Sequence, residues 1–189
     1  MQTHRLKPIA AAAALGTLLA LSACVPASSE EPMNTEQSNA AASQTGTSQA
    51  SPQVILLNML RVMDELVQLQ GGEWTYEDDA LFDPTSTAGY WGMTTCGDDI
   101  NRQYSSAVLT GPGVSSPEDA AAAAAAHFAA QGFTETNKFE SSIENNRYIV
   151  QTLSHPDGSA VFYQPGTGHS SINIESACSS DPGMDMRSQ

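Results

Sequence analysis

The clearest pattern along the chain is an apolar stripe at helical spacing between Pro52 and Gln70. Ser51 suits a helix cap, Pro52 suits the first helical turn, and Gly71-Gly72 is typical of a helix end. Further apolar residues flank the stripe, so we expect the helix to lie against a sheet, with a partner-binding helix as the alternative. The stripe comprises Ile55, Met59, Val62, Met63, Leu66 and Leu69, flanked by Val54, Leu56, Leu57, Leu60 and Val67.

The pattern after Gly72 is that of a loop followed by a strand. Residues 73–97 mix aromatic and acidic side chains without a period, which predicts a long irregular loop region. Residues 102–110 alternate enough to predict a strand, and Gly111-Pro112-Gly113 ends it.

A second helix is predicted from Pro117 onward. Ser115 or Ser116 caps it, and the two acidic residues of its first turn favour the helix dipole. The alanines of residues 120–126 propagate the helix, and Gly132 closes it.

Four later segments have the apolar content and turn boundaries of strands: 139–144, 147–154, 160–164 and 171–177. The Asn, Pro, Asp and Gly residues between them suit hairpins. In the last segment Ile172 and Ile174 share one face, and Cys178 would lie on it if the strand continued. The order of elements predicts an α+β fold: an antiparallel sheet of four to five strands with two helices packed on one face.

The first 23 residues have the layout of a secretory signal. A short start with Arg5 and Lys7 precedes an apolar run, residues 9–21, which is too short for a comfortable membrane span. The run ends in Leu21-Ser22-Ala23-Cys24, which resembles the bacterial lipobox. This resemblance implies cleavage before Cys24, acylation of Cys24 by palmitate or a similar fatty acid, and location on the outer face of the cell membrane. The alternative is a plain secretory peptide cut near Ala23 or Ala27.

The composition divides the remaining chain into three parts. Residues 24–51 are Ser, Ala, Gln, Thr, Asn, Glu and Pro with little apolar surface, which predicts a disordered tether. Residues 52–180 form a single α+β domain in this interpretation, and residues 181–189 form a flexible tail.

The chain is strongly acidic, with 21 Asp and Glu against 7 Lys and Arg and a formal charge of −14. Loss of Arg5 and Lys7 with the leader brings the charge to −16. Such a surface repels nucleic acid and anionic lipid. Solubility outside the cell is the simpler explanation, and a binding role for cations or basic proteins is the alternative.

Cys96 and Cys178 remain once Cys24 is committed to lipid. Export places them where thiols oxidise, so we expect a Cys96–Cys178 disulfide. It would close a loop of about 80 residues and stabilise the fold by roughly 4 to 5 kcal/mol on the chain-entropy estimate. A metal or catalytic role is disfavoured, because neither cysteine sits in a CxxC and no nearby His completes a ligand set.

The sequence contains no GxSxG, HExxH, SxxK, P-loop or GxGxxG motif, so we expect no catalytic residues and no cofactor. His127, His155 and His169 are interpreted as a helix-surface residue and two hairpin-loop residues. A hydrolase that uses His155, or His169 with Ser170, ranks last among the hypotheses.

Two residue groups of the predicted loop region are candidate binding groups. The acidic group contains Asp78, Asp79 and Asp83, which are weak candidates for calcium ligands, and Glu77, Asp98 and Asp99 could join them. The spacing fits no EF-hand, and a solvated acidic loop is the simpler interpretation. Aromatic rings stack on sugars and grip proteins, although core packing is the simpler role. The aromatic candidates for a partner or glycan contact are Trp74, Tyr76, Tyr90 and Trp91.

The whole layout resembles small actinobacterial lipoproteins, including the mycobacterial LppA-like group. The resemblance rests on the lipobox, the polar tether and the final segment Ile172-Asn173-Ile174-Glu175-Ser176-Ala177-Cys178. It implies no catalytic residues. We therefore expect a monomeric, membrane-anchored, non-enzymatic lipoprotein that binds an envelope protein or a cell-wall polymer. A small-ligand or metal-binding lipoprotein is the alternative.

Overall fold

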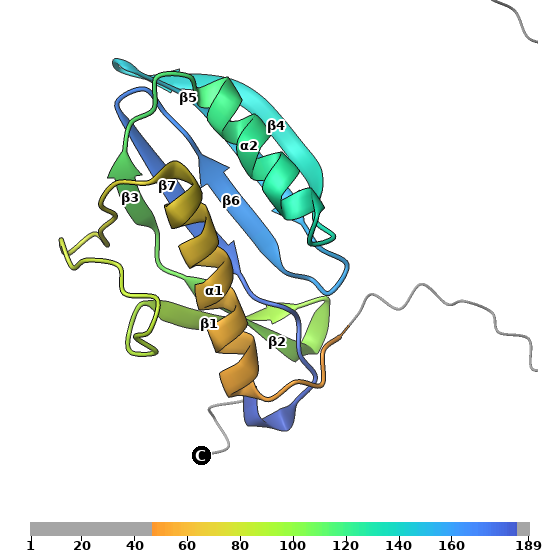
Figure 1. Ribbon diagram of the computed structural model, residues 1–189. Coiled ribbons are helices and arrows are strands. Elements are labelled where there is room, and N and C mark those ends of the chain that lie inside the picture. The colour runs from red at the N-terminus through yellow and green to blue at the C-terminus, as the bar shows by residue number, and fades with distance from the viewer. Residues whose placement is uncertain (1–46, 185–189) are drawn as a thin grey trace, which may run out of the picture. The chain divides into compact units, whose positions relative to one another are not determined.

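The computed structural model describes residues 47–184, which contain two α-helices and seven strands (Figure 1). The predicted leader, the predicted lipidation residue Cys24, most of the predicted tether and residues 185–189 lie outside the described residues. Their predictions stay predictions. The first part of the predicted flexible tail is ordered instead, because Pro182–Met184 form a 3-10 helix and Met184 is buried. None of the helices in residues 47–184 is long and apolar enough to cross a membrane.

Helix α1, Pro52–Gln70, follows the apolar stripe. Ser51 takes the cap position, but its side chain makes no capping hydrogen bond. Gly71 has φ 76°, and its N–H donates to the carbonyl oxygen of Val67 at 2.8 Å, so the predicted glycine end is confirmed. The buried residues of α1 are Ile55, Leu56, Met59, Leu60, Val62, Met63, Leu66 and Val67.

Helix α2, Pro117–Ala129, is capped by Ser116, whose hydroxyl oxygen accepts a hydrogen bond from the Asp119 N–H at 3.3 Å. Ala121, Ala124 and Phe128 have no exposed surface. The small alanines let the helix approach the sheet closely.

Seven strands form one antiparallel sheet in the order β1-β2-β7-β6-β5-β4, and β3 pairs with β7. The first three strands are β1 Trp91–Cys96, β2 Asp98–Ser106 and β3 Leu109–Pro112. The others are β4 Thr134–Ile143, β5 Asn146–Ser154, β6 Ala160–Gln164 and β7 His169–Glu175.

The predicted α+β class is confirmed, and the strand count corrects the prediction of four to five strands. Strand β1 occupies part of the region predicted as loop. The predicted strand 102–110 divides between β2 and β3, because the chain leaves the sheet at Ala107 and Val108. Strand β4 begins five residues earlier than predicted, at Thr134 instead of Phe139, through a polar and exposed stretch.

Both helices lie on the same side of the sheet, as predicted (Figure 1). The side chain of Gln151 on β5 donates to the Ala121 carbonyl oxygen of α2 at 3.0 Å. On β6, the Tyr163 hydroxyl donates to Gln70 of α1 at 2.6 Å. The strand residues that build the core against the helices are Ile149, Leu153, Val161, Tyr163, Ile172 and Ile174.

Candidate functional site

The side of the sheet that faces away from the helices forms the broadest candidate surface. Cross-strand partners share a face, and Phe139 pairs with Val150 while Thr152 pairs with Phe162. These residues alternate with the buried residues that pack against the helices, so they lie on the opposite side. No helix of the described residues covers that side (Figure 1). We call it the open face: Phe139, Ser141, Tyr148, Val150, Thr152, Phe162, Gln164, Ser171, Asn173 and Glu175.

The open face is almost free of charge, although the chain carries a formal charge of −14. Glu175 is the one ionic residue of this set, and the exposed His169 of β7 lies on the same face. The charged residues of β4 and β5 lie on the helix side, where Glu135 accepts a hydrogen bond from Gln151 at 2.6 Å and Arg147 pairs with Glu118 and Glu140.

A hollow of about 380 Å³ lies where the open face meets the β4–β5 and β6–β7 turns. Asn146 is fixed in this hollow. Its Oδ1 accepts a hydrogen bond from the Gly168 N–H at 2.7 Å, and its Nδ2 donates to the His169 carbonyl oxygen at 3.3 Å. A Cβ on Gly166 would come within 2.6 Å of the Asn146 side chain, so glycine permits this approach. The hollow, which we call the hairpin hollow, is lined by residues that include Ile143, Glu144, Tyr148, Gln164, His169 and Ser171.

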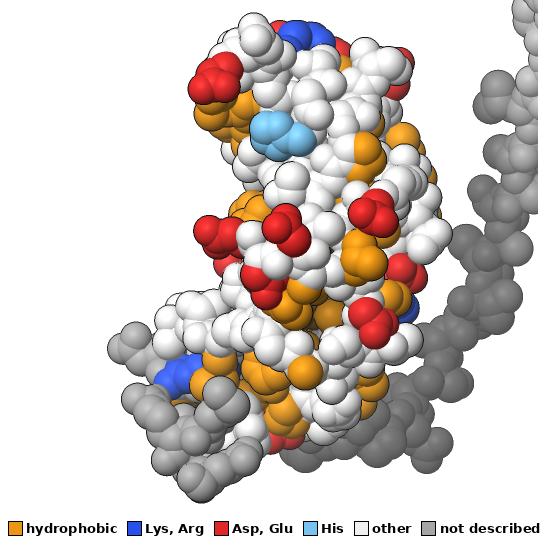
Figure 2. All heavy atoms as spheres, turned by 90° about the vertical axis from the view of Figure 1, so that its left-hand side faces the viewer, with side chains coloured by type: hydrophobic (Ala, Val, Ile, Leu, Met, Phe, Trp, Pro, Cys, Tyr) orange, Lys and Arg blue, Asp and Glu red, His pale blue; other side chains and the backbone are white. Residues whose placement is uncertain are grey.

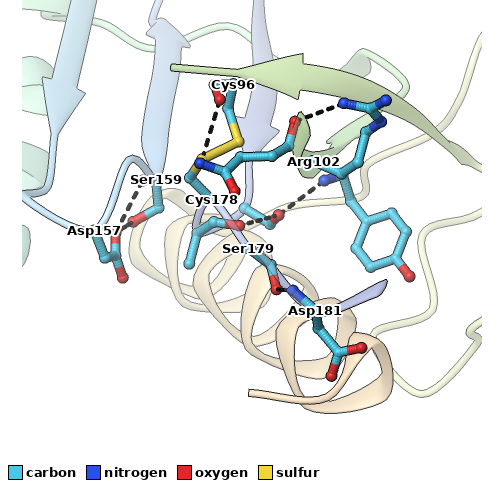
Figure 3. Close-up of a disulfide and its surroundings, with 11 residues drawn as sticks. Cys96, Arg102, Asp157, Ser159, Cys178, Ser179 and Asp181 are labelled. Atoms are coloured by element: carbon cyan, nitrogen blue, oxygen red, sulfur yellow. Dashed lines mark hydrogen bonds between the residues drawn. A yellow bond between two sulfur atoms is a disulfide. The ribbon is translucent and has the colours of Figure 1, made fainter. Parts of the chain in front are cut away.

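The predicted disulfide joins the end of β1 to the segment that follows β7 (Figure 3). Cys96 and Cys178 have an S–S distance of 2.09 Å and a Cα–Cα distance of 5.8 Å, so the prediction is confirmed. Beside the disulfide, Arg102 and Ser179 exchange backbone hydrogen bonds of 2.8 and 2.9 Å. The strand ends at Glu175, so Cys178 is positioned by this irregular segment and not by a continued strand. An open hollow of about 720 Å³ lies against the disulfide.

His155, Asp157 and Ser159 form a polar cluster in the β5–β6 turn, at the rim of the disulfide hollow. His155 Nδ1 lies 2.8 Å from Asp157 Oδ1, and the Ser159 hydroxyl donates to the same oxygen at 2.6 Å. Burial alone would raise the pKa of Asp157, but hydrogen bonds from Ser159 and His155 outweigh it and lower the pKa. The hydroxyl bonds the carboxylate and not the imidazole, so this arrangement does not activate a serine nucleophile.

A smaller groove of about 220 Å³ lies between α1, the residues after α2 and the β5–β6 turn. Its floor is apolar and includes Ile55, Met59 and Phe133, which are buried. Its rim is polar and includes Asn58, Arg61, Gln131, His155 and Asp157. An apolar floor with a few polar rim groups is the common form of a small-molecule site.

The other two histidines take structural roles. His127 Nε2 lies 3.1 Å from Glu65, so it links α2 to α1 instead of standing alone on the helix surface. His169 is exposed, whereas Ser170 is buried and its hydroxyl oxygen accepts from Gln70 and Gly166. Adjacent strand residues point to opposite faces, so His169 and Ser170 do not form a catalytic pair.

The four aromatic candidates divide into a buried and a half-buried pair. Trp74 and Tyr76 are core residues, 2% and 6% exposed, which confirms the packing interpretation for both. Neither ring is exposed to a partner, so the prediction that Trp74 and Tyr76 contact a partner or glycan is wrong. Tyr90 and Trp91 are half-buried; Tyr90 stacks on Tyr76 with ring centroids 3.8 Å apart. A partner contact through the four candidates is therefore restricted to Tyr90 and Trp91.

The acidic candidates are used by local turns. Asp78 Oδ1 accepts from the Ala80 N–H, and its Oδ2 accepts from the Tyr90 hydroxyl, which raises the pKa of Tyr90. Asp83 accepts from the hydroxyl and N–H of Thr85. The side chains of Asp98 and Asp99 are outside the described part of the structure, and among the side chains described in residues 47–184 no group of three His, Cys, Asp or Glu is placed to hold a metal ion. Figure 2, a view onto the loop side, shows the acidic side chains spread over the surface between apolar ones.

The sequence interpretation misses the open face and the hairpin hollow. The available signal is the alternation along β5, where Tyr148, Val150 and Thr152 interleave with buried Ile149 and Gln151. Alternation identifies a face that points to the core, but it does not tell whether a helix or solvent covers the other face.

No protein-family model and no curated protein matches the chain. Among solved structures, the chain is similar to a DUF4853 family protein from Actinomyces odontolyticus ATCC 17982, with a TM-score of 0.43 and 16% sequence identity. The match covers 67% of this chain and 65% of the other, so this chain spans less than two thirds of that protein's length. A likeness at this level carries no argument about function.

Proposed function

We propose that the protein is a membrane-anchored, extracytoplasmic lipoprotein whose domain is a non-enzymatic module that binds an envelope protein or a cell-wall polymer. The open face carries the binding part of this proposal: a broad, almost uncharged surface on a strongly acidic chain. The leader and lipobox support the anchor. The Cys96–Cys178 disulfide supports export, because disulfides persist in oxidising compartments.

The polar clusters also favour binding over catalysis. The hydroxyl of Ser159 donates to Asp157, and Ser170 accepts from Gln70 and Gly166, so both hydroxyls serve structural hydrogen bonds. Neither lies in the serine–imidazole geometry that a hydrolase requires.

The anchor is tested by metabolic labelling with palmitate. We expect the wild type to be labelled and to fractionate with membranes, and Cys24→Ser to lose the label and enter the medium. Two acyl chains hold a protein on a membrane where a single chain does not. An unlabelled, freely secreted wild type would refute the anchor.

The binding surface is tested by photocrosslinking in intact cells. A crosslinking amino acid at Phe139, on the open face, should capture an envelope component. The same amino acid at Leu57, which is 46% exposed on α1, serves as the control, because Phe139 is similarly exposed at 51%. Equal capture at both positions would remove the support for the open face.

The groove favours a second candidate, a lipoprotein that binds a small amphipathic ligand. Its volume of about 220 Å³ is small for a ligand site, although cavities of about 150 Å³ hold benzene. Native mass spectrometry of protein purified from its own cells should then show a bound mass. Met59→Trp, which fills the groove, should abolish that mass, and an adduct-free wild type would end this candidate.

A further inference from the structure

We propose that the open face binds an uncharged polysaccharide, with one sugar unit in the hairpin hollow against Tyr148. This inference rests on the proposed binding function and names the class of partner and the residues that contact it.

Most charged side chains of these strands lie on the helix side of the sheet. The face that points to solvent on an antiparallel sheet ordinarily carries polar and charged residues. Here the ionic residues Glu135, Lys138, Glu140 and Arg147 pair with partners on the helix side, which leaves Glu175 on the open face and Glu144 and His169 at the hairpin hollow. The carboxylates Glu144 and Glu175 disfavour an anionic ligand, and two isolated carboxylates give a cationic polymer little complementary charge, whereas an uncharged ligand requires none.

The open face presents aromatic rings and hydroxyl groups side by side. Phe139 is 51% exposed, and Tyr148 and Phe162 are half-buried. Aromatic rings offer flat apolar surfaces to the C–H faces of a pyranose ring. Thr152, beside Phe162, has a hydroxyl that can donate to and accept from sugar hydroxyls.

Hydrogen bonds fix the geometry of the hairpin hollow. Its volume of about 380 Å³ lies within the usual range of ligand sites. The hydrogen bonds of Asn146 to the Gly168 N–H and the His169 carbonyl oxygen hold the β6–β7 turn against β5 before any ligand arrives. Such preorganisation reduces the entropy cost of binding. Tyr148 and the exposed amide of Gln164 both line this hollow.

A protein partner fits the open face less well. Stable protein interfaces bury about 800 Å² per partner around an apolar core that is fully desolvated. The large apolar side chains at least 40% exposed on β4–β7 are Phe139 and Ile143, and Thr, Ser and Asn residues separate the other rings. A glycan needs such an interleaved pattern of rings and hydroxyl or amide groups.

The experiment measures retention of the full mature protein on insoluble polysaccharide. The probe is wall polysaccharide of the producing cells, stripped of protein and of anionic polymers. Dextran beads and dextran sulfate beads share the same polymer backbone and differ in charge, so the pair tests the effect of ligand charge on retention. We expect the wild type to be retained by the neutral wall glycan and not by dextran sulfate, which the acidic surface repels.

Single variants assign the retention to residues. Phe139→Ala and Tyr148→Ala should each weaken binding about tenfold, the effect of one lost aromatic contact. Tyr148→Phe should keep most of the affinity, because it keeps the ring. Leu57→Ala, a change of similar exposure on α1, should have no effect. Circular dichroism melting of each variant separates lost contacts from lost folding.

Three results would overturn the inference: no retention of the wild type on neutral wall glycan, equal losses in Leu57→Ala and Tyr148→Ala, or a wild-type dimer that Phe139→Ala disperses in sedimentation. If the glycan assay fails while the Phe139 photocrosslinker still captures a protein in cells, the proposed binding function stands and only the polysaccharide is wrong. If both assays fail, both proposals fall.

Discussion

At the scale of single residues, Gly111 shows how one missing side chain places a core aromatic. An added Cβ at Gly111 would lie 2.2 Å from the indole of Trp74. The ring therefore lies directly on the backbone of β3, and its Nε1 donates to the Gly71 carbonyl oxygen at 3.1 Å. The sequence predicts Gly111-Pro112-Gly113 as a strand break, whereas Gly111 and Pro112 are the last residues of β3.

Gly111→Ala should destabilise the domain by about 1 to 3 kcal/mol, because the buried indole of Trp74 must shift to admit a methyl group. Urea denaturation measures the loss. Gly92→Ala is the matched control, since Gly92 also lies in a strand and its added Cβ would meet nothing within 4 Å. Equal effects of the two substitutions would show that the contact with Trp74 does not decide the stability.

Asp157 gives a pH-dependent contribution at the same scale. Its pKa is lowered in the folded domain, because the hydrogen bonds from Ser159 and His155 outweigh the effect of burial. Its stabilisation is therefore present above the unfolded pKa of about 4 and is lost as the pH falls through the lower folded pKa.

We expect Asp157→Asn to flatten part of the decline in the free energy of unfolding at pH values below about 4. Denaturant titrations of both proteins between pH 2 and 7 measure this. Above that range the variant should be the less stable protein, because it has lost the charge-assisted hydrogen bonds. Parallel pH profiles for the two proteins would contradict the assignment.

At the scale of elements, the disulfide connects parts that the sheet joins weakly. Strand β2 pairs with β7 in register only at Ser105 and Glu175, so the β1–β2 hairpin depends on contacts beyond that ladder. These include the packing of Tyr104 in the core, its hydrogen bonds with Ser176, the bonds of Asn173 and Ile174 to Ser106, the Arg102–Ser179 backbone bridge and the Cys96–Cys178 bond (Figure 3).

Replacing both cysteines by serine should lower the free energy of unfolding by about 4 to 5 kcal/mol on the chain-entropy estimate, since the two positions are 82 residues apart. The β1–β2 hairpin should lose amide protection before the β4–β5 hairpin does. Hydrogen exchange with and without reductant measures both effects. Uniform protection across the two hairpins after reduction would show that the bond does not hold the β1–β2 hairpin in place.

Some helices and strands can be predicted from local sequence patterns, and others cannot. Both helices and β6 follow closely from the sequence, because their apolar periods, caps and turn residues agree. Strand β1 and the first half of β4 are missed because they are exposed edge strands. Such strands can form without a regular alternation of apolar and polar residues in the sequence. The hairpin hollow arises from two turns 20 residues apart, and a local pattern does not record such a meeting.

At the scale of the whole molecule, the acidic excess acts on the compact state. The chain has 21 acidic and seven basic side chains, so its excess negative charges repel one another, and salt screens this repulsion. The Debye length falls from about 30 Å at 0.01 M to about 8 Å at 0.15 M. At low salt, charges far apart on the surface therefore still repel one another.

We therefore expect the melting temperature to rise by a few degrees between 0.01 M and 0.15 M NaCl, because screening relieves self-repulsion in the folded domain. Calcium chloride at matched ionic strength distinguishes diffuse acidity from a calcium site in the 78–83 loop. If the acidic residues act only through their combined charge, calcium and sodium should raise the melting temperature similarly. The double substitution Asp78→Asn and Asp79→Asn should then leave both responses unchanged. A larger calcium response that this double substitution removes would establish a site in the loop, and a melting temperature independent of NaCl would show that self-repulsion is not significant.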